Sequence, residues 1–183
     1  MGKSQKGGQF ERDISKQLSL WLTKGERDDI FWRSSQSGGR ATERSKKGKK
    51  TAGSYGDITA LDPIGHRFLE IFCIELKRGY TKDTDAINFI DSKKAKPTLL
   101  QFWDQCVESR VQSDSDECMV IFKRDGKMPC VMIEFDMLER LEQTTKLINF
   151  SIVTITLNDK YAPVLAIMSL HKFLEWLDPD VFT

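Results

Sequence analysis

The chain has 183 residues, of which 39% are hydrophobic and 30% charged, and its formal net charge is +1. This apolar content is enough for a folded domain with a substantial core, which excludes a wholly disordered chain. The near-neutral charge argues neither for nor against a polyanionic partner, so the position of the basic residues matters more than their number.

The four cysteines are far apart and form no CxxC or Cys/His cluster, so a zinc site is not expected (Cys73, Cys106, Cys118 and Cys130). The N-terminus is polar and basic and lacks the apolar segment of a signal peptide. No apolar run approaches the roughly 18 residues that span a bilayer. We therefore expect a reduced, cytoplasmic protein that does not enter a membrane.

The first predicted element is a helix that starts at Gln9 and ends near Gly25. Its apolar residues recur at three- and four-residue spacing (Phe10, Ile14, Leu18, Trp21 and Leu22). Residues 29–33 predict a short strand. Residues 34–54 contain four glycines and six basic residues against one glutamate, which predicts a long solvated loop. A loop of this length inside a compact domain indicates function or disorder.

A hairpin is predicted next, with strands near residues 55–61 and 68–77 and a turn at residues 62–66. Both faces of the second strand are apolar at its start, which is typical of a central strand that is covered on both sides.

The rest of the chain predicts an alternation of helices and strands. We expect a helix over residues 97–111, a strand-turn-strand unit over 118–135, a short helix over 136–147, strands over 150–157 and 163–169, and a last helix that Ser169 caps. The four tryptophans fall on apolar stripes or strands and are assigned to the core (Trp21, Trp32, Trp103 and Trp176). The order of elements predicts a mixed α/β protein.

The two strands of the predicted hairpin carry charged side chains among their apolar residues. Asp57 lies in the first strand, and Glu75 and Lys77 lie at the end of the second, where side-chain alternation points both to one face. Hairpin geometry can bring Asp57 opposite them, although the sequence leaves the register open.

Two carboxylates that are buried together require a compensating cation. Lys77 supplies one positive charge, and Mg²⁺ with oxygen ligands would supply the rest. This combination favours phosphodiester hydrolysis. The alternative is a salt bridge at a strand end with Asp57 in a turn, because the D…ExK pattern is short and degenerate.

These residues resemble the PD-(D/E)xK nuclease superfamily. Gly56-Asp57 stands at the family's Pro-Asp, and residues 74–77, IELK, stand at its (D/E)xK. Glycine in place of proline is a departure, but the family's proline shapes the backbone and is not a ligand. The resemblance implies a restriction-endonuclease-like α/β core, with a central mixed β-sheet flanked by helices.

Within the superfamily, residues 6–80 are most similar to archaeal Holliday-junction resolvases. The matching segments are KGGQFERDISKQL at residues 6–18 and FWRSSQS at residues 31–37, followed by the two acidic strands in the same order. The similarity continues more weakly to about residue 135, and the last 45 or so residues have no identified counterpart.

The resemblance implies a role for each matching residue. The catalytic set is Glu11, Asp57, Glu75 and Lys77, and its three acids would hold Mg²⁺, for which Mn²⁺ is expected to substitute. Arg33 and Ser37 would contact the phosphates of the scissile strand, and Lys6 is assigned to the same DNA-binding set. Glu11 also borders the apolar stripe of its helix and could reach inward.

The largest departure from those resolvases is an insertion over residues 38–54. We predict a basic, flexible DNA-binding loop, because clustered cations gain from counterion release (Arg40, Arg44, Lys46, Lys47, Lys49 and Lys50). A solvated linker is the alternative. An added arm beside the site could also redirect substrate choice.

We therefore expect a single nuclease domain over residues 1–183, with a catalytic core at 6–135 and a C-terminal extension of the sheet or a dimer surface at 136–183. The expected function is that of a Mg²⁺-dependent DNA endonuclease, resolvase-like, acting on branched or duplex DNA in recombination or repair. A homodimer is expected because a four-way junction has two-fold symmetry. The alternatives are a duplex-cutting restriction-, repair- or phage-type nuclease and a non-catalytic nucleic-acid-binding module. RNA stays open as a substrate, because nothing in the sequence is known to read a 2′-hydroxyl.

Overall fold

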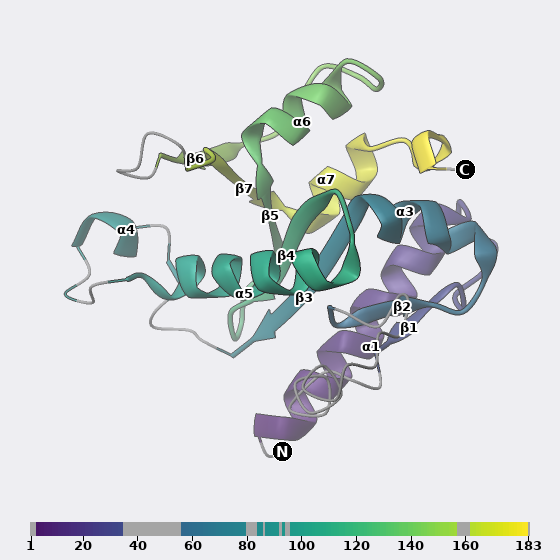
Figure 1. Cartoon of the computed structure of the whole chain (residues 1–183), viewed down its shortest axis with the longest axis horizontal. Helices are drawn as coiled ribbons and strands as arrows, with labels where there is room; N and C mark the ends of the chain where they lie inside the picture. The colour runs from purple at the N-terminus through teal and green to yellow at the C-terminus, as the bar shows by residue number, and fades with distance from the viewer. Residues whose placement is uncertain are drawn as a thin grey trace.

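The computed structural model describes residues 3–34, 56–79, 84–85, 87–91, 93, 96–156 and 162–182, with the backbone alone described for residues 3–6 (Figure 1). Its centre is a five-stranded sheet in the order β3-β4-β5-β7-β6. The strands are β3 (Phe72–Arg78), β4 (Glu117–Lys123), β5 (Cys130–Glu134), β6 (Ile152–Ile155) and β7 (Leu165–Ser169). β3 and β4 are parallel and the other neighbours are antiparallel, so the sheet is mixed.

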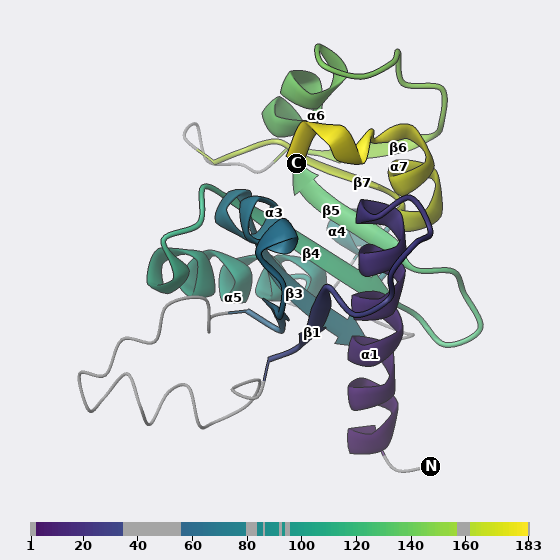
Figure 2. The same cartoon turned by 90° about the vertical axis from the view of Figure 1, so that its right-hand side faces the viewer.

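Helices cover both faces of this sheet (Figures 1 and 2). One face packs against α1 (Lys3–Leu22), α6 (Phe135–Glu142) and α7 (Leu170–Trp176) in a single apolar cluster that includes Phe72, Ile74 and Leu76 of β3. The other face packs against α5 (Thr98–Ser113) through residues such as Phe102 and Cys106. The molecule is thus an α/β protein with a mixed central sheet flanked by helices, compatible with a restriction-endonuclease-like fold.

Most predicted elements are confirmed. α1, α5, α6 and α7 overlap the predicted helices, and the strand-turn-strand unit is formed by β4 and β5. The Ser169 side chain caps α7 by accepting a hydrogen bond from the backbone N–H of Lys172. α4 (Asn88–Asp91) and the 3-10 helix η2 (Pro179–Phe182) had not been predicted.

The predicted hairpin is wrong. β2 (Ile58–Ala60) pairs antiparallel with β1 (Phe31–Arg33), outside the five-stranded sheet. The chain then forms the 3-10 helix η1 (Pro63–Gly65) and the helix α3 (His66–Ile71), so β3 begins only at Phe72.

Local chemistry explains this helical connection. The Asp62 carboxylate caps η1 by accepting from the backbone N–H of Ile64, and proline follows at the first position of the turn. In α3, Phe68 is buried while Arg67 and Glu70 are exposed, which is a helical rather than an alternating pattern.

The predicted central position of the second strand is also wrong, although both of its faces are covered. β3 lies at the edge of the five-stranded sheet. Its last two residues, Lys77 and Arg78, are half-buried, and the five before them are buried. The free edge of β3 is therefore open to the segment that carries Asp57.

Trp32 is a further correction. The sequence pattern assigns it to the core, but 48% of its surface is exposed, because it occupies the outward position of β1 between the buried Phe31 and the half-buried Arg33. The other three tryptophans are buried or half-buried (Trp21, Trp103 and Trp176).

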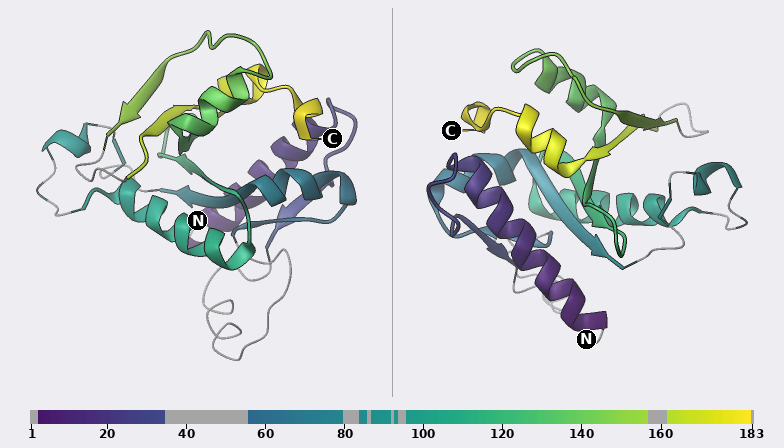
Figure 3. Two further views of the ribbon diagram at one scale, coloured as in Figure 1. Left: turned by 45° about the horizontal axis from the view of Figure 1, so that its top comes forward. Right: turned by 180° about the vertical axis from the view of Figure 1, so that it is seen from behind.

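The C-terminal strands β6 and β7 belong to the same sheet as β3 and β4 (Figure 3). Within the residues that the structure describes, none of the helices is both long enough and apolar enough to cross a bilayer.

Candidate active site

Asp57 is attached to the free edge of β3 by both its backbone and its side chain. Its N–H donates a 2.8 Å hydrogen bond to the Ile74 carbonyl, and its Oδ2 accepts a 2.8 Å bond from the backbone N–H of Leu76. The carbonyl of Asp57 in turn accepts a 2.8 Å bond from the N–H of Ser34, directly after β1. These bonds place Asp57 between β1 and the residues Glu75 to Lys77.

Glu75 and Lys77 form the second half of the site. Glu75 is 3% exposed, and its Oε1 forms a hydrogen-bonded ion pair with the Nζ of Lys77. The Lys77 ammonium also lies 5.8 Å from the centre of the Phe102 ring, on α5. Because β3 alternates, the Glu75 and Lys77 side chains leave the strand on its α5 side.

The surroundings of Asp57 disfavour its charged form. Burial, and then the neighbouring Glu75 carboxylate, raise the pKa of Asp57 to about 7, although the Leu76 N–H and the Lys77 ammonium act in the opposite direction. Lys77 alone therefore does not neutralise the pair, and the site favours an additional cation.

Glu11 approaches this pair from α1. Its Oε2 lies 3.1 Å from the Nε of Arg33 in a salt bridge but makes no hydrogen bond, although this oxygen is buried. Burial, and then the charge of Asp57, raise the pKa of Glu11, while the Arg33 guanidinium lowers it. Glu11 is thus close enough for the charge of Asp57 to affect its pKa, but its salt-bridge partner is Arg33.

The structure brings together Asp57, Glu75 and Lys77. Glu11 lies beside this group, in a salt bridge with Arg33. The part of the chain described by the structure contains no group of three His, Cys, Asp or Glu side chains that could hold a metal ion. The membership of Glu11 in a three-acid ligand set therefore stays a prediction.

Several predicted DNA-binding residues lie outside the described residues: Ser37, Arg40, Arg44, Lys46, Lys47, Lys49 and Lys50. Lys6 lies in α1, but its side chain is not among those described. Arg33 is described, and it contacts Glu11.

The carboxylates of this site supply oxygen ligands of the kind that a divalent cation needs. Asp57 and Glu75 offer adjacent, buried carboxylates whose mutual repulsion a cation would relieve, and Glu11 offers a buried oxygen without a hydrogen bond. Hard carboxylate oxygens are the ligands that Mg²⁺ and Mn²⁺ prefer.

Gly56 is also part of the site, although the sequence alone does not show that a glycine is needed there. Its φ is +86°, and a Cβ at this position would lie 2.8 Å from the Ile74 carbonyl oxygen. The glycine directly before the acid was visible in the sequence, but only the fold shows that the backbone here touches β3.

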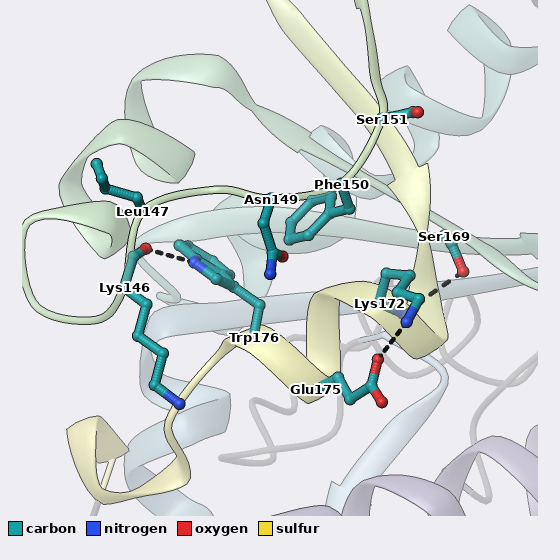
Figure 4. Close-up of a pocket in the computed structure, with 9 residues that line it drawn as sticks. All are labelled: Lys146, Leu147, Asn149, Phe150, Ser151, Ser169, Lys172, Glu175 and Trp176. Carbon is teal, nitrogen blue, oxygen red and sulfur yellow. Dashed lines mark hydrogen bonds and ion pairs between the residues drawn. The ribbon is translucent and has the colours of Figure 1, made fainter.

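A pocket of about 700 Å³ lies elsewhere, between the segment from Lys146 to Ser151 and the helix α7 (Figure 4). The pocket is lined by Trp176, whose Nε1 donates a hydrogen bond to the Lys146 carbonyl, and by the ion pair between Lys172 and Glu175. None of the residues that line it belongs to the carboxylate site.

One comparison with known proteins gave a match. The model of a family described as "Phage putative PDDEXK endonuclease" matches residues 2–182. No curated protein and no solved structure matched the chain.

Proposed function

Because the chain belongs to the phage PDDEXK endonuclease family, we propose that it is a metal-dependent DNA endonuclease whose catalytic centre is formed by Asp57, Glu75 and Lys77. One observation carries this proposal: two buried carboxylates and an ammonium meet at the free edge of β3. Two acids whose charge is disfavoured beside one lysine are the kind of group that holds a metal ion for phosphoryl chemistry.

Each residue has a distinct role in the proposed hydrolysis. Asp57 and Glu75 would hold Mg²⁺, with Glu11 as a further candidate ligand. When bound, the ion supplies Lewis-acid stabilisation of phosphoryl charge. Lys77 would orient the attacking water or balance charge on the phosphate. The Leu76 N–H keeps the Asp57 carboxylate turned toward Glu75. Lys77 is held in turn by Glu75 and by the ring of Phe102.

The proposed substrate is branched DNA, cut by a resolvase-like homodimer. The support is the similarity of residues 6–18 and 31–37 to the archaeal resolvases, together with the two-fold symmetry of a four-way junction. The family's description as phage endonucleases supports a second candidate, a duplex-cutting enzyme of the same chemistry.

Catalysis is tested by nicking assays with Mg²⁺ or Mn²⁺. We expect Asp57→Asn, Glu75→Gln and Lys77→Met to lower the rate by about 100-fold or more, since each removes charge stabilisation in the transition state. Glu70→Gln is the matched control, because Glu70 is exposed on α3. Wild-type protein that cuts no DNA in either metal would contradict the proposal, and DNA binding without cleavage would support the non-catalytic module.

Substrate choice is tested by comparing a four-way junction with its linear arms. Symmetric incisions near the branch, together with a dimeric mass in solution, are the result expected for a resolvase. Equal cutting of the arms would instead establish the duplex-cutting alternative.

A further inference from the structure

Two basic side chains face each other directly at the C-terminal ends of β3 and β4. Arg78 and Lys123 are register partners in this parallel pair. Leu76 and Ile121, two residues earlier on each strand, are buried in the cluster that α1 covers. Because side chains alternate along a strand, Arg78 and Lys123 leave the sheet on that same face.

Among the residues that the structure describes, neither charge has a close ion-pair partner. The Nε of Arg78 is buried without a hydrogen bond, and its salt bridge to the Oδ1 of Asp125 is long, at 4.0 Å. Within the described part of the chain, no ion pair involves Lys123, which is half-buried. By contrast, the residue after Lys123 is paired: Arg124 forms a 2.9 Å salt bridge with Asp85.

Like charges directly opposite each other on neighbouring strands are unfavourable, so this pair lowers the stability of the sheet. An anion between or above the two side chains would reverse that effect. Arg78 also follows Lys77 immediately, so the pair lies one residue beyond the proposed catalytic centre along β3, but on the opposite face of the sheet from Lys77.

We propose that Arg78 and Lys123 form a phosphate-binding site for the DNA backbone, adjacent to the scissile position. This inference rests on the proposed function. A guanidinium offers a planar fork of donors for phosphate oxygens, and an ammonium adds a second point of charge. The end of β3 and the β4–β5 connection lie toward the same end of the molecule as the N-terminal half of α1 (Figures 2 and 3). A backbone that passes this end can contact both faces of β3.

The test is the salt dependence of binding to a 20-base-pair DNA duplex in EDTA, which keeps the probe uncut. Removing one phosphate contact lowers the slope of log K against log salt by about 1. We expect Lys123→Gln to do so and to weaken binding about 5- to 10-fold near 0.1 M salt, and Arg78→Gln with Lys123→Gln to lower the slope by about 2. Arg78→Lys keeps the charge and should retain most of the slope.

Two controls match these changes in charge. Arg67→Gln removes an exposed arginine from α3, at the opposite end of β3, and Lys172→Gln removes an exposed lysine from α7. Equal slopes for Lys123→Gln and Lys172→Gln, with wild-type protein that binds and cuts DNA, would overturn the phosphate site and leave the endonuclease intact. Wild-type protein that neither binds nor cuts DNA would remove both. Thermal unfolding of each variant separates lost binding from lost folding.

Discussion

Gly56 holds a backbone conformation that other residues adopt only at a cost, and it does so where the chain touches β3. Its φ of +86° is in the left-handed region, and the Ile74 carbonyl leaves no room for a Cβ. Proline, the family's residue at this position, fixes φ near −65°. The glycine is therefore the residue that this backbone path requires, rather than a neutral replacement.

We predict that Gly56→Ala and Gly56→Pro both abolish detectable cleavage, because they displace Asp57 from the Leu76 N–H. Restoring the family's Pro-Asp pair should thus inactivate this protein. Gly25→Ala is the matched control, since Gly25 has a φ of +95° but nothing within 4 Å of the added Cβ. It should cost about 1–2 kcal/mol of stability and leave the cleavage rate unchanged. Nicking rates and thermal unfolding measure the two effects, and an active Gly56→Pro protein would show this account to be wrong.

The raised pKa of Asp57 makes the metal-free protein less stable as pH increases. The group titrates near 3.8 when unfolded and near 7 when folded, so no penalty exists below pH 4 and the full penalty is reached above pH 7. We predict that Asp57→Asn stabilises the metal-free protein by about 1–4 kcal/mol at pH 8, but not at pH 4.

Denaturant unfolding in EDTA at the two pH values measures this difference. Asp62→Asn is a control of opposite sign, because hydrogen bonds from the Ile64 N–H and Arg27 lower the pKa of Asp62. That variant should lose stability at neutral pH. If Asp57→Asn changes stability equally at pH 4 and pH 8, burial and the Glu75 charge do not raise the pKa of Asp57 as described.

At the scale of elements, a polar stripe along α1 attaches this helix to β1. Ser19 is fully buried, and its Oγ donates to the Ser15 carbonyl and accepts a 2.8 Å hydrogen bond from the backbone N–H of Phe31. Four residues later, the Thr23 Oγ1 accepts from the N–H of Arg27 in the turn after α1. These bonds set the position of β1, and with it Arg33, against the helix that carries Glu11.

We predict that Ser19→Ala costs about 1–3 kcal/mol, because it leaves the buried N–H of Phe31 without an acceptor. Ser15→Ala is the control: Ser15 is also buried, but the bond that its hydroxyl makes among the described residues is to the carbonyl of Glu11, within the helix. Denaturant unfolding should separate the two variants clearly. Equal losses would mean that the link to β1 contributes nothing.

At the scale of the whole molecule, the C-terminal residues complete the core of the N-terminal half. Phe182 is 1% exposed, and its ring lies 5.1 Å from that of Phe68 on α3 and 5.8 Å from that of Trp21 on α1. The Nε1 of Trp21 donates to the carbonyl of Leu177 as well. Residues 177–182 therefore hold α1, which carries Glu11, and α3, which leads into β3.

We predict that Phe182→Ala lowers stability by about 3–5 kcal/mol and that the whole protein still unfolds in one transition. The neighbouring Val181 is 36% exposed, so Val181→Ala should change stability by less than about 1 kcal/mol. Calorimetry distinguishes one transition from two. A separate early transition in Phe182→Ala would show that the N-terminal half folds independently of the C-terminal strands.

The sequence by itself predicted the features that depend on neighbours in the chain. Helical periodicity located α1 and α5, the cap at Ser169 marked the start of α7, and the spacing of Asp57, Glu75 and Lys77 pointed to phosphodiester chemistry. These signals are local, because propensity, capping and alternation act over only a few residues.

Only the tertiary structure decided where those elements meet. It placed β3 at a sheet edge and replaced the expected hairpin with η1 and α3. It also showed that Asp57 is hydrogen-bonded to β3, where Gly56 lets the two backbones approach. It also paired Glu11 with Arg33 and set Arg78 opposite Lys123. The physical reason is that strand register and close backbone approach depend on packing between residues far apart in the chain, for which no local pattern of side chains carries the information.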